Sequence, residues 1–458
     1  MKGKAPGTLR PDRVSTRLQR IAKLSRDLKG KPLTTLSHHI DLLWLYEACR
    51  RTRRGGATGV DRQTGAEYHS NLDSNLRSLL ERFHTGPYRA PPVRRVEIPK
   101  GDEQRRPIGI PTYEDKVLQR AVAMVLNAVY EEEFLDCSYG FRPGRSAHDA
   151  LQALWDGLMK LGGGWVLDLD IESFFDRLDH GKLREILDTR VRDGVIRRQI
   201  DKWLKAGVLC EGRRDDPVRG TPQGGVISPL LANIYLHEVL DVWFERDVLA
   251  RMRGRAFLVR YADDAVMVFS EKRDAERVFE VLPKRLTRYG LSLHPEKTRR
   301  LRFERPKPPG KPQTNDRPET FNFLGLTHYW GRSRRGRWIV KRKTSAGRFR
   351  RSLRALSKWL RRYRHLRLPV QHRKLSQAME GHYRYYGVTT NLPSLGRFEY
   401  SLKRIWRKWL GRRSQRGMSE ELFYTKILHR YPLPEPRCYA SIYRCTPRIA
   451  NLPFRGAG

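Results

Sequence analysis

The sequence is short of acidic residues compared with basic ones. Asp plus Glu number 50 against 92 Lys plus Arg, which gives a formal net charge of +42 at pH 7. This deficit of negative charge indicates a polyanionic partner, because each phosphate that Lys or Arg neutralises releases a condensed counterion. Ribosomal proteins, integrases and membrane-surface proteins can be as basic, so the charge indicates a class of partner and leaves the activity open.

Cysteines and long apolar runs are also scarce. Five cysteines are scattered over 458 positions without a Cys-x-x-Cys pair, so we expect no disulfide framework or zinc finger, and a reducing compartment is favoured. No apolar run approaches the roughly 18 residues of a membrane span, so no membrane partner is expected. The basic start lacks the apolar core of a secretory signal. A nucleic-acid-binding N-terminal arm is the simpler interpretation of this start, and an organellar presequence stays open.

Hydrophobic patterning divides the chain into segments. The 39% hydrophobic content and the length predict two or three domains with sizeable cores. Residues 35–85 read as helices around a Gly-rich break, residues 93–110 as a hairpin, and residues 113–134 as an amphipathic helix. Basic helices with aromatic residues at intervals follow from about 345 to 415.

Acidic residues stand at the ends of short apolar runs. The run 165–170 ends in Asp170, and the runs 257–261 and 265–269 are joined by a turn that contains Asp263 and Asp264. Adjacent strands would bring these carboxylates to one edge of a sheet. Nucleotidyl transfer uses two divalent cations roughly 3.5–4 Å apart, and Mg²⁺ prefers hard oxygen ligands. Asp-Asp is also common in hairpin turns, so the turn alone does not establish catalysis.

Three motifs in a fixed order give the acidic residues a more specific meaning. The motifs are Asp170-Ile171-Glu172-Ser173-Phe174-Phe175-Asp176, residues 220–233 (GTPQGGVISPLLAN) and Tyr261-Ala262-Asp263-Asp264. They resemble the palm motifs of reverse transcriptases, and their sequences are similar to those of group II intron reverse transcriptase/maturases of the bacterial type. The likeness extends to residues 59–61, 98–100, 106–111, 139–146, 296–298, 323–325, 381–387, 412–416 and 431–437.

The resemblance implies an α+β right-hand polymerase fold, with an antiparallel palm sheet packed by helices and an α-helical thumb. It implies a basic N-terminal extension of the fingers (1–85), fingers and palm (86–330), and a helical thumb or maturase domain (331–415). Residues 416–458 would form a short DNA-binding-like tail. The family's optional His-Asn-His endonuclease domain, which carries two Cys pairs, is expected to be absent, because the last two cysteines lie too far apart for such a pair.

The resemblance also implies the catalytic residues. Asp170, Asp263 and Asp264 match the carboxylates that hold two Mg²⁺ ions, and the backbone carbonyl of Ile171 matches a further metal ligand. Asp168 lies two residues before Asp170 on the same strand face but outside the motif, and we interpret it as structural or solvated.

Further residues are implied to bind the incoming nucleotide. Lys100 and Arg106 are similar to the pair that clamps the triphosphate, an assignment that depends on the resemblance because the chain is basic throughout. Phe175 matches the aromatic ring under the sugar, which favours deoxynucleotides, although an ordinary core Phe would look the same. Gln223 would hydrogen-bond at the nascent base pair. Lys297 matches a proposed general acid for pyrophosphate, and a surface Lys is the alternative.

Contacts with the template or intron RNA are implied for Arg142 and Arg145, in the loop 139–146, and for Gly224. Glycine permits close backbone approach at this turn, although a plain strand-to-helix turn would use the same residue. The basic helices of the thumb are implied to grip folded RNA through its shape, phosphates and 2′-hydroxyls. We expect most of their aromatic residues to belong to the core.

The resemblance implies an RNA-directed DNA polymerase encoded by a group II intron, which copies intron RNA into DNA and binds that RNA to assist splicing. Its partners would be intron RNA, an RNA template, a DNA primer or target and dNTPs, and a homodimer stays open. One alternative is a domesticated enzyme of DNA repair or phage defence, although Ala262 is the usual intron-type residue. Another is an RNA-binding splicing factor without polymerase activity, against which the three intact carboxylates argue.

Overall fold

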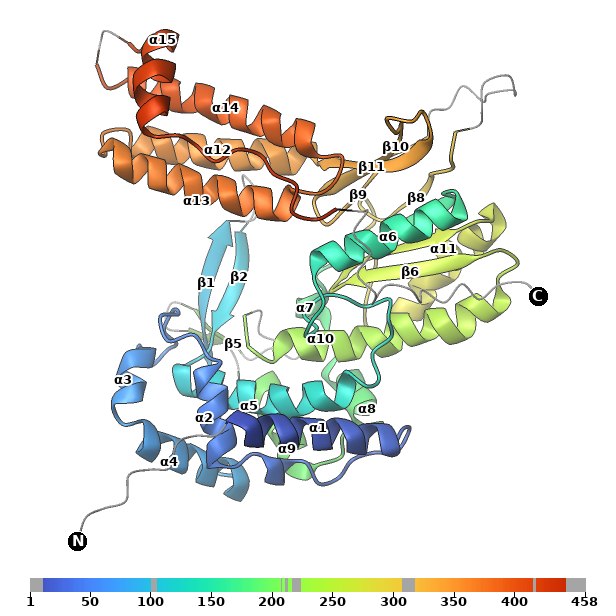
Figure 1. Ribbon diagram of the computed structural model, residues 1–458. Helices are drawn as coiled ribbons and strands as arrows, with labels where there is room; N and C mark the ends of the chain where they lie inside the picture. Colours follow the sequence, from blue (N-terminus) through green and yellow to red (C-terminus); the bar gives the residue numbers. More distant parts are fainter. Residues whose placement is uncertain are drawn as a thin grey trace.

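The computed structural model describes residues 11–99, 105–206, 208–210, 213–215, 224–306, 318–414 and 417–441. Within these ranges the chain mixes helices with antiparallel sheets, which confirms the predicted α+β class. An N-terminal helical body lies at the bottom of Figure 1, a central sheet at the right and a C-terminal helical body at the top. None of the described helices is long and apolar enough to cross a membrane.

The N-terminal body is built around helix α5, Tyr113–Tyr130. Its apolar side chains recur at helical spacing and nearly all are buried, as the periodicity predicts. The hydroxyl of Thr112 caps the helix by accepting a hydrogen bond from the Asp115 backbone N–H. The surrounding helices are α1 (Pro11–Asp27), α2 (Leu42–Arg50), α3 (Gly65–Ser70), α4 (Leu72–Thr85), α8 (His180–Asp188) and α9 (Gly194–Leu204).

The predicted hairpin is present as β1 (Val93–Pro99) and β2 (Arg105–Ile110), which pair antiparallel. Two short strands, β4 (Val208–Cys210) and β5 (Arg213–Asp215), extend it to a sheet of order β2-β1-β4-β5. The hairpin rises from the N-terminal body toward the C-terminal helices (Figure 1). The tip of the hairpin lies outside the described residues.

The central sheet has the order β6-β7-β3-β8, and all its neighbouring strands are antiparallel. Its strands are β3 (Trp165–Asp170), β6 (Ala256–Tyr261), β7 (Asp264–Phe269) and β8 (Arg299–Arg302). The sheet separates two cores, because alternate residues such as Leu167 and Val166 belong to different hydrophobic clusters.

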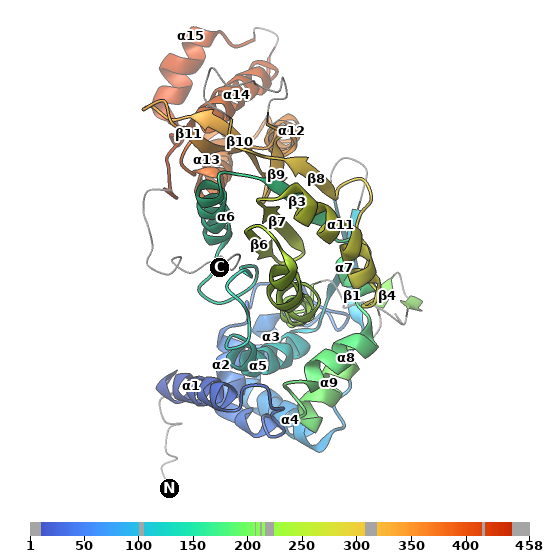
Figure 2. The ribbon, with the colours of Figure 1, turned by 90° about the vertical axis from the view of Figure 1, so that its right-hand side faces the viewer.

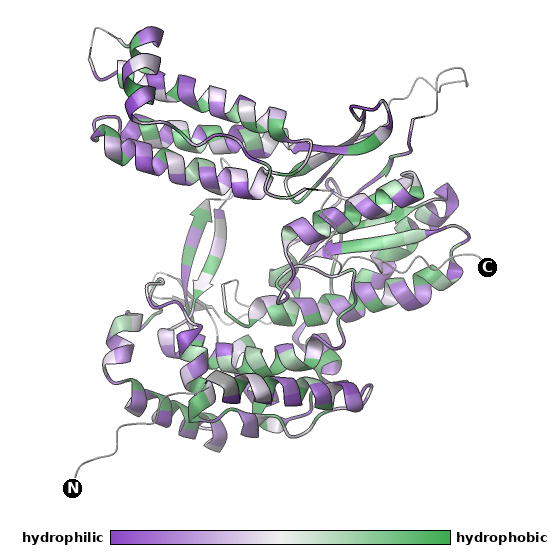
Figure 3. Ribbon diagram, in the orientation of Figure 1, coloured by the Kyte–Doolittle hydropathy of each residue, from purple (hydrophilic) through white to green (hydrophobic). Residues whose placement is uncertain are grey.

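Different helices cover the two faces of this sheet. Helix α6 (Ala147–Leu161) lies on one side and α11 (Lys272–Thr287) on the other (Figure 2). Helix α10 (Ser228–Leu236), which belongs to the core on the α11 side, continues through π-helical turns at His237–Val242 and Phe244–Val248. The apolar character of β6 between these layers is visible in Figure 3.

The C-terminal part contains a small sheet and three long helices. The sheet has the order β11-β10-β9, with β9 (Phe321–Phe323), β10 (Leu326–Arg332) and β11 (Trp338–Thr344). The predicted domain boundary after residue 330 falls inside β10, whose hydrogen-bonded partner β11 lies beyond it. The helices are α12 (Ala346–Arg362), α13 (Leu368–Tyr386) and α14 (Leu392–Gly411), followed by the short α15 (Glu420–Leu422).

Aromatic residues of the C-terminal helices divide between core and surface. Trp406 and Tyr383 are buried in the helical core, whereas Tyr400 is 55% exposed. The polar faces of these helices are extensive (Figure 3). Helix α6 ties this part to the central sheet, because the indole N–H of Trp155 donates to the Val340 carbonyl at 2.8 Å.

A buried carboxyl group, Asp115, connects the N-terminal body to the start of α10. It accepts hydrogen bonds from the Tyr88 hydroxyl at 2.8 Å, the Trp203 indole at 2.6 Å and the Gln119 amide at 2.9 Å. The Gln119 side-chain oxygen in turn accepts from the Val226 backbone N–H at 2.7 Å. Burial raises the pKa of Asp115 to about 6. This network therefore anchors the turn that precedes α10.

We predict that Asp115 makes stability depend on pH. Its folded pKa of about 6 lies above the ordinary Asp value of 3.8, so the free energy of unfolding falls by about 3 kcal/mol as pH rises from about 4 to 6. An Asp115→Asn variant should lack this contribution, whatever its absolute stability. Urea unfolding of both proteins between pH 4 and 7 measures the difference, and parallel pH profiles would show that Asp115 does not hold its proton in the folded state.

Candidate active site

The catalytic candidates meet at one edge of the central sheet. Asp170, the last residue of β3, stands opposite Asp264, the first residue of β7. Directly opposed side chains on antiparallel strands share a face, with Cβ atoms roughly 5 Å apart. Asp263 is the second residue of the two-residue turn that joins β6 to β7, directly before Asp264. The strand register therefore brings the three carboxylates together, as the motif spacing predicts.

The turn has a strained backbone at Ala262. Its φ of +57° lies in the left-handed region, which costs a residue with a Cβ roughly 1–2 kcal/mol. Two-residue hairpin turns with a positive φ at only the first turn residue usually have Gly there. A Cβ added to Gly140 would lie 2.4 Å from the Ala262 backbone nitrogen, so the loop 139–146 packs directly on the turn. The surroundings therefore hold Ala262 in a conformation that it would not choose alone.

The carboxylates oppose one another electrostatically. Desolvation, followed by the charges of Asp263 and Asp170, raises the pKa of Asp264 to about 7 although the residue still reaches solvent. Arg348 of α12 acts in the opposite sense. Burial also raises the pKa of Asp168 to about 6, and its carboxylate lies 3.4 Å from Arg299. A divalent cation at this edge would relieve the repulsion.

The donor set fits a magnesium site that substrate completes. Carboxylate and carbonyl oxygens are ligands that Mg²⁺ accepts, and Mg²⁺ commonly binds through one or two carboxylates together with substrate phosphates and water. Over the described ranges, no three His, Cys, Asp or Glu side chains form a metal-binding group by themselves. Ile171, whose carbonyl is a further candidate ligand, is buried and bridges Leu293.

Lys297 lies beside the candidate metal ligands. Its ammonium group is 3.4 Å from the Asp170 carboxylate, and its side chain is 54% exposed. The segment is fixed to the end of β3 by two bonds to the Asp170 carbonyl, from the His294 N–H at 2.8 Å and from the Thr298 hydroxyl at 3.3 Å. The structure thus brings Lys297 to the site instead of leaving it on a remote surface.

The other nucleotide-binding candidates are placed only in part. Phe175 is half-buried on the short helix α7, Phe174–Arg177, with its ring 5.4 Å from that of Phe174. Arg106 lies on β2 opposite Ile98, but its side chain lies outside the described part of the chain. Lys100 and Gln223 lie wholly outside it.

Arg142 does not occupy a position from which it can contact RNA. Its side chain is 3% exposed and forms an ion pair with Glu131 at 3.0 Å. Its remaining terminal nitrogen donates to the carbonyls of Leu135 and Ser138. The predicted RNA contact is therefore replaced by a structural role, in which Arg142 folds the segment that leads to the loop 139–146.

Arg145 and Gly224 also have structural partners. Arg145 donates to the Asp136 carboxylate at 2.6 Å, and its side chain is 24% exposed. Gly224 has a φ of +111°, and a Cβ there would lie 2.5 Å from the Gly109 carbonyl oxygen of β2. Close packing against the hairpin accounts for this glycine without any contact to RNA.

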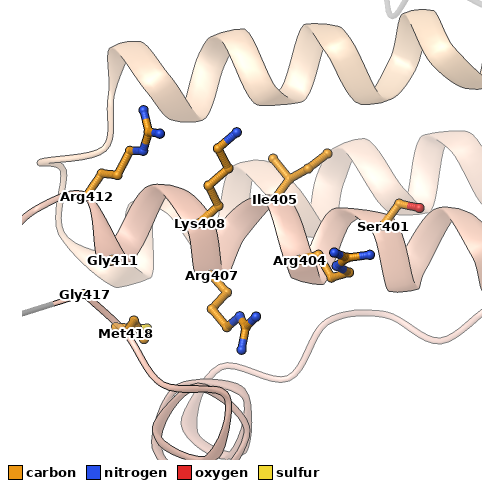
Figure 4. Close-up of a pocket in the computed structure, with 9 residues that line it drawn as sticks. All are labelled: Ser401, Arg404, Ile405, Arg407, Lys408, Gly411, Arg412, Gly417 and Met418. Carbon is orange, nitrogen blue, oxygen red and sulfur yellow. The ribbon is translucent and has the colours of Figure 1, made fainter.

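A basic surface pocket of about 580 Å³ lies at the far end of α14 (Figure 4). Lys408 and Arg412 project to one side of the helix and Arg407 to the other. Arg407 pairs with Glu420 at 2.9 Å, and the Lys408 and Arg412 side chains extend over the Trp409 ring. The pocket, which lies away from the central sheet (Figure 1), is lined by Ser401, Arg404, Ile405, Arg407, Lys408, Gly411, Arg412, Gly417 and Met418.

Comparison with known proteins identifies relatives of the chain. Residues 98–328, just over half of its length, match the family model "Reverse transcriptase (RNA-dependent DNA polymerase)". The group II intron-encoded protein LtrA of Lactococcus lactis subsp. cremoris is 36% identical over 227 residues, covering 48% of this chain and 37% of that protein. Protein YkfC of Escherichia coli K12 is 36% identical over 256 residues, covering 49% and 67%.

More distant relatives include an organellar protein. Nuclear intron maturase 2, mitochondrial, of Arabidopsis thaliana is 29% identical over 175 residues, covering 30% of this chain and 24% of that protein. The match with LtrA spans little more than a third of that protein's length.

We predict that Ala262→Gly raises stability. Glycine adopts a positive φ without the Cβ penalty, so the variant should gain roughly 0.5–1 kcal/mol even after its greater loss of chain entropy. Thermal unfolding of the metal-free protein measures this gain. Ala265→Gly, in the adjoining strand β7, is the matched control and should lose stability. An equal loss in both variants would show that the turn stores no strain.

Proposed function

The chain belongs to the reverse transcriptase (RNA-dependent DNA polymerase) family, and from this premise we propose that it is the RNA-directed DNA polymerase and maturase of a group II intron. The observation that carries the proposal is the opposition of Asp170 and Asp264 across β3 and β7, with Asp263 in the adjoining turn. The relatives named as intron proteins favour an intron host over a domesticated repair or defence enzyme. The three intact carboxylates argue against a splicing factor without polymerase activity.

The site residues have distinct roles in this proposal. Asp170, Asp263 and Asp264, with the Ile171 carbonyl, would hold two Mg²⁺ ions that, when bound, activate the primer 3′-hydroxyl and neutralise the triphosphate. Lys297 is close enough to the site to give a proton to the departing pyrophosphate.

The remaining candidates would bind the nucleotide. Phe175 would lie under its sugar and exclude a 2′-hydroxyl, which selects deoxynucleotides. Lys100 and Arg106 would clamp the triphosphate, since a Lys point charge and an Arg fork suit that anion. Gln223 would hydrogen-bond at the nascent base pair.

We assign the parts of the fold to a polymerase hand. The N-terminal helices and the β1–β2 hairpin correspond to the fingers, the central sheet to the palm, and α12–α14 to the thumb. The proposed template and primer would run between the hairpin and the thumb, with Arg348 on α12 close enough to influence the Asp264 carboxyl. The bacterial relatives favour the bacterial cytoplasm as the compartment.

The basic pocket on α14 supports a second, RNA-binding role for the thumb. Its Arg and Lys side chains would form a phosphate-binding surface at the far end of α14, away from the central sheet. RNA recognition of this kind depends on phosphates, shape and 2′-hydroxyls. Polymerisation would therefore take place at the central sheet, and folded intron RNA would bind at the far end of the thumb.

Asp263→Ala should abolish Mg²⁺-dependent DNA synthesis on an RNA template. We expect a loss of at least about 1,000-fold in kcat, because the removed carboxylate is a proposed ligand of the metal ions that activate the 3′-hydroxyl and neutralise the triphosphate, with unchanged binding of the template–primer duplex. Primer extension and a filter-binding assay measure the two quantities. Asp247→Ala, which removes a half-exposed carboxylate from the segment after α10, is the control. Full activity of the Asp263 variant would refute the site.

Lys408→Glu combined with Arg412→Glu should weaken binding of the intron RNA without slowing extension of a short primer on a simple template. The slope of log affinity against log salt should fall by about 0.7–0.9 for each lost phosphate contact. Arg277→Glu with Lys284→Glu, on α11, changes the net charge equally and should leave the slope unaltered. Equal effects of both pairs would show only a general dependence on charge.

A further inference from the structure

The charged side chain of Arg260 lies inside the palm candidate. Arg260 is the next-to-last residue of β6, two positions before Ala262 of the turn, and is fully buried. A guanidinium group has five N–H donors, and the structure gives one acceptor to each. These acceptors are both Asp241 carboxylate oxygens at 2.7 and 2.6 Å, the Asn233 side-chain oxygen at 2.9 Å, the Ala262 carbonyl at 2.9 Å and the Ser138 hydroxyl at 2.8 Å.

The Arg260–Asp241 pair is completely desolvated. Both side chains are 0% exposed, and Asp241 belongs to the π-helical continuation of α10. A buried ion pair adds little net stability, because its desolvation penalty offsets most of its attraction, whereas the loss of one partner is strongly destabilising. Stability alone therefore does not explain why a charged pair stands here instead of apolar residues.

The contacts of Arg260 converge on the backbone of the catalytic turn. Its guanidinium holds the carbonyl of Ala262, the residue with the left-handed φ, and so fixes the peptide group that leads into Asp263. The same terminal nitrogen holds Asn233, whose amide donates to the Gly140 carbonyl at 2.6 Å. Gly140 in turn packs on the Ala262 nitrogen. The turn is thus held from both sides by one connected network.

We propose that Arg260, oriented by Asp241, is a positioning residue that sets the direction of the Asp263 carboxylate for metal binding. The proposal rests on the proposed function, because it assigns Asp263 as a metal ligand. A Lys at this position keeps the charge, but its three donors radiate from one atom and cannot satisfy a carboxylate, an amide, a hydroxyl and the turn together. Charge alone is therefore insufficient, and the planar fork is required.

The test compares Arg260→Lys, Asn233→Ala and wild type in two measurements. Electron paramagnetic resonance counts free Mn²⁺ and gives the Mn²⁺ affinity of the protein without nucleic acid. Primer extension gives kcat and the KM for dNTP. We expect Arg260→Lys to weaken Mn²⁺ binding about 10-fold, as losses of residues that orient metal ligands do. It should lower kcat about 100-fold, the effect of a displacement of about 1 Å, at an unchanged KM.

Asn233→Ala keeps the buried ion pair and therefore provides a second variant if Arg260→Lys does not fold. It should change Mn²⁺ binding and kcat in the same direction. The matched control is Glu133→Gln. Glu133 pairs at 2.8 Å with another buried arginine, Arg190, in the N-terminal body, and the substitution disturbs that pair. That variant should lose stability while it keeps the Mn²⁺ affinity and kcat of the wild type.

The outcomes separate this inference from the proposed function. Wild-type Mn²⁺ affinity and kcat in the folded Arg260 or Asn233 variant would overturn the positioning role, even if the protein is a polymerase. The wild type could bind Mn²⁺ but copy no RNA. In that case, a weaker Mn²⁺ affinity of these variants would support the positioning role while the proposed function fails. Because substrate completes the proposed metal site, a wild-type protein that binds no Mn²⁺ even with a chain-terminated template–primer and dNTP present would refute both.

Discussion

The candidate active-site edge depends on one constraint, the register of β3 against β7. That register places Asp170 and Asp264 directly opposite each other and leaves Asp263 in the adjoining two-residue turn. The carboxylates of Asp170 and Asp263 carry the same charge as that of Asp264, and their repulsion contributes to the raised pKa of Asp264. A slip of one residue would move the alternate side chains of β7 to the other face of the sheet, so the two hydrophobic cores hold the carboxylates together against their repulsion.

The rest of the palm candidate restrains this edge from several directions. Gly140 lets one loop pack on the turn, Arg260 holds the Ala262 carbonyl from inside, and the segment that carries Lys297 is bonded to the Asp170 backbone. The Asp115–Gln119 network anchors the turn before α10 from the N-terminal body. These contacts hold the carboxylate edge rigidly, and in the proposed function substrate would supply the remaining ligands of the metal ions.

Local patterns in the sequence predict much of this architecture. The amphipathic spacing that begins at Tyr113 gives α5, the polar tip between two strand-like runs gives the β1–β2 hairpin, and the run that ends in Asp170 gives β3. The β10–β11 hairpin lacks such a pattern. Its buried face includes His328, and its turn is rich in Arg, so the alternation of apolar and polar residues is obscured.

The partners of buried charges could not be predicted, because they are distant in the sequence. Arg142 looks like a nucleic-acid contact in so basic a chain, yet Glu131 holds it inside the fold. Arg260 is a charged residue in an otherwise apolar strand-like run, and this pattern indicates a buried charge. Nothing in the sequence identifies Asp241 as its partner. The roles of Lys100 and Gln223 stay predictions from the resemblance.

The most direct measurement is a structure of the protein with an RNA template, a DNA primer, a non-hydrolysable dNTP and Mn²⁺, with the metals located by anomalous scattering. We expect two ions roughly 3.5–4 Å apart, bound between the triphosphate and the carboxylates of Asp170, Asp263 and Asp264. Ions bound elsewhere, or a nucleotide bound away from this edge, would contradict this expectation.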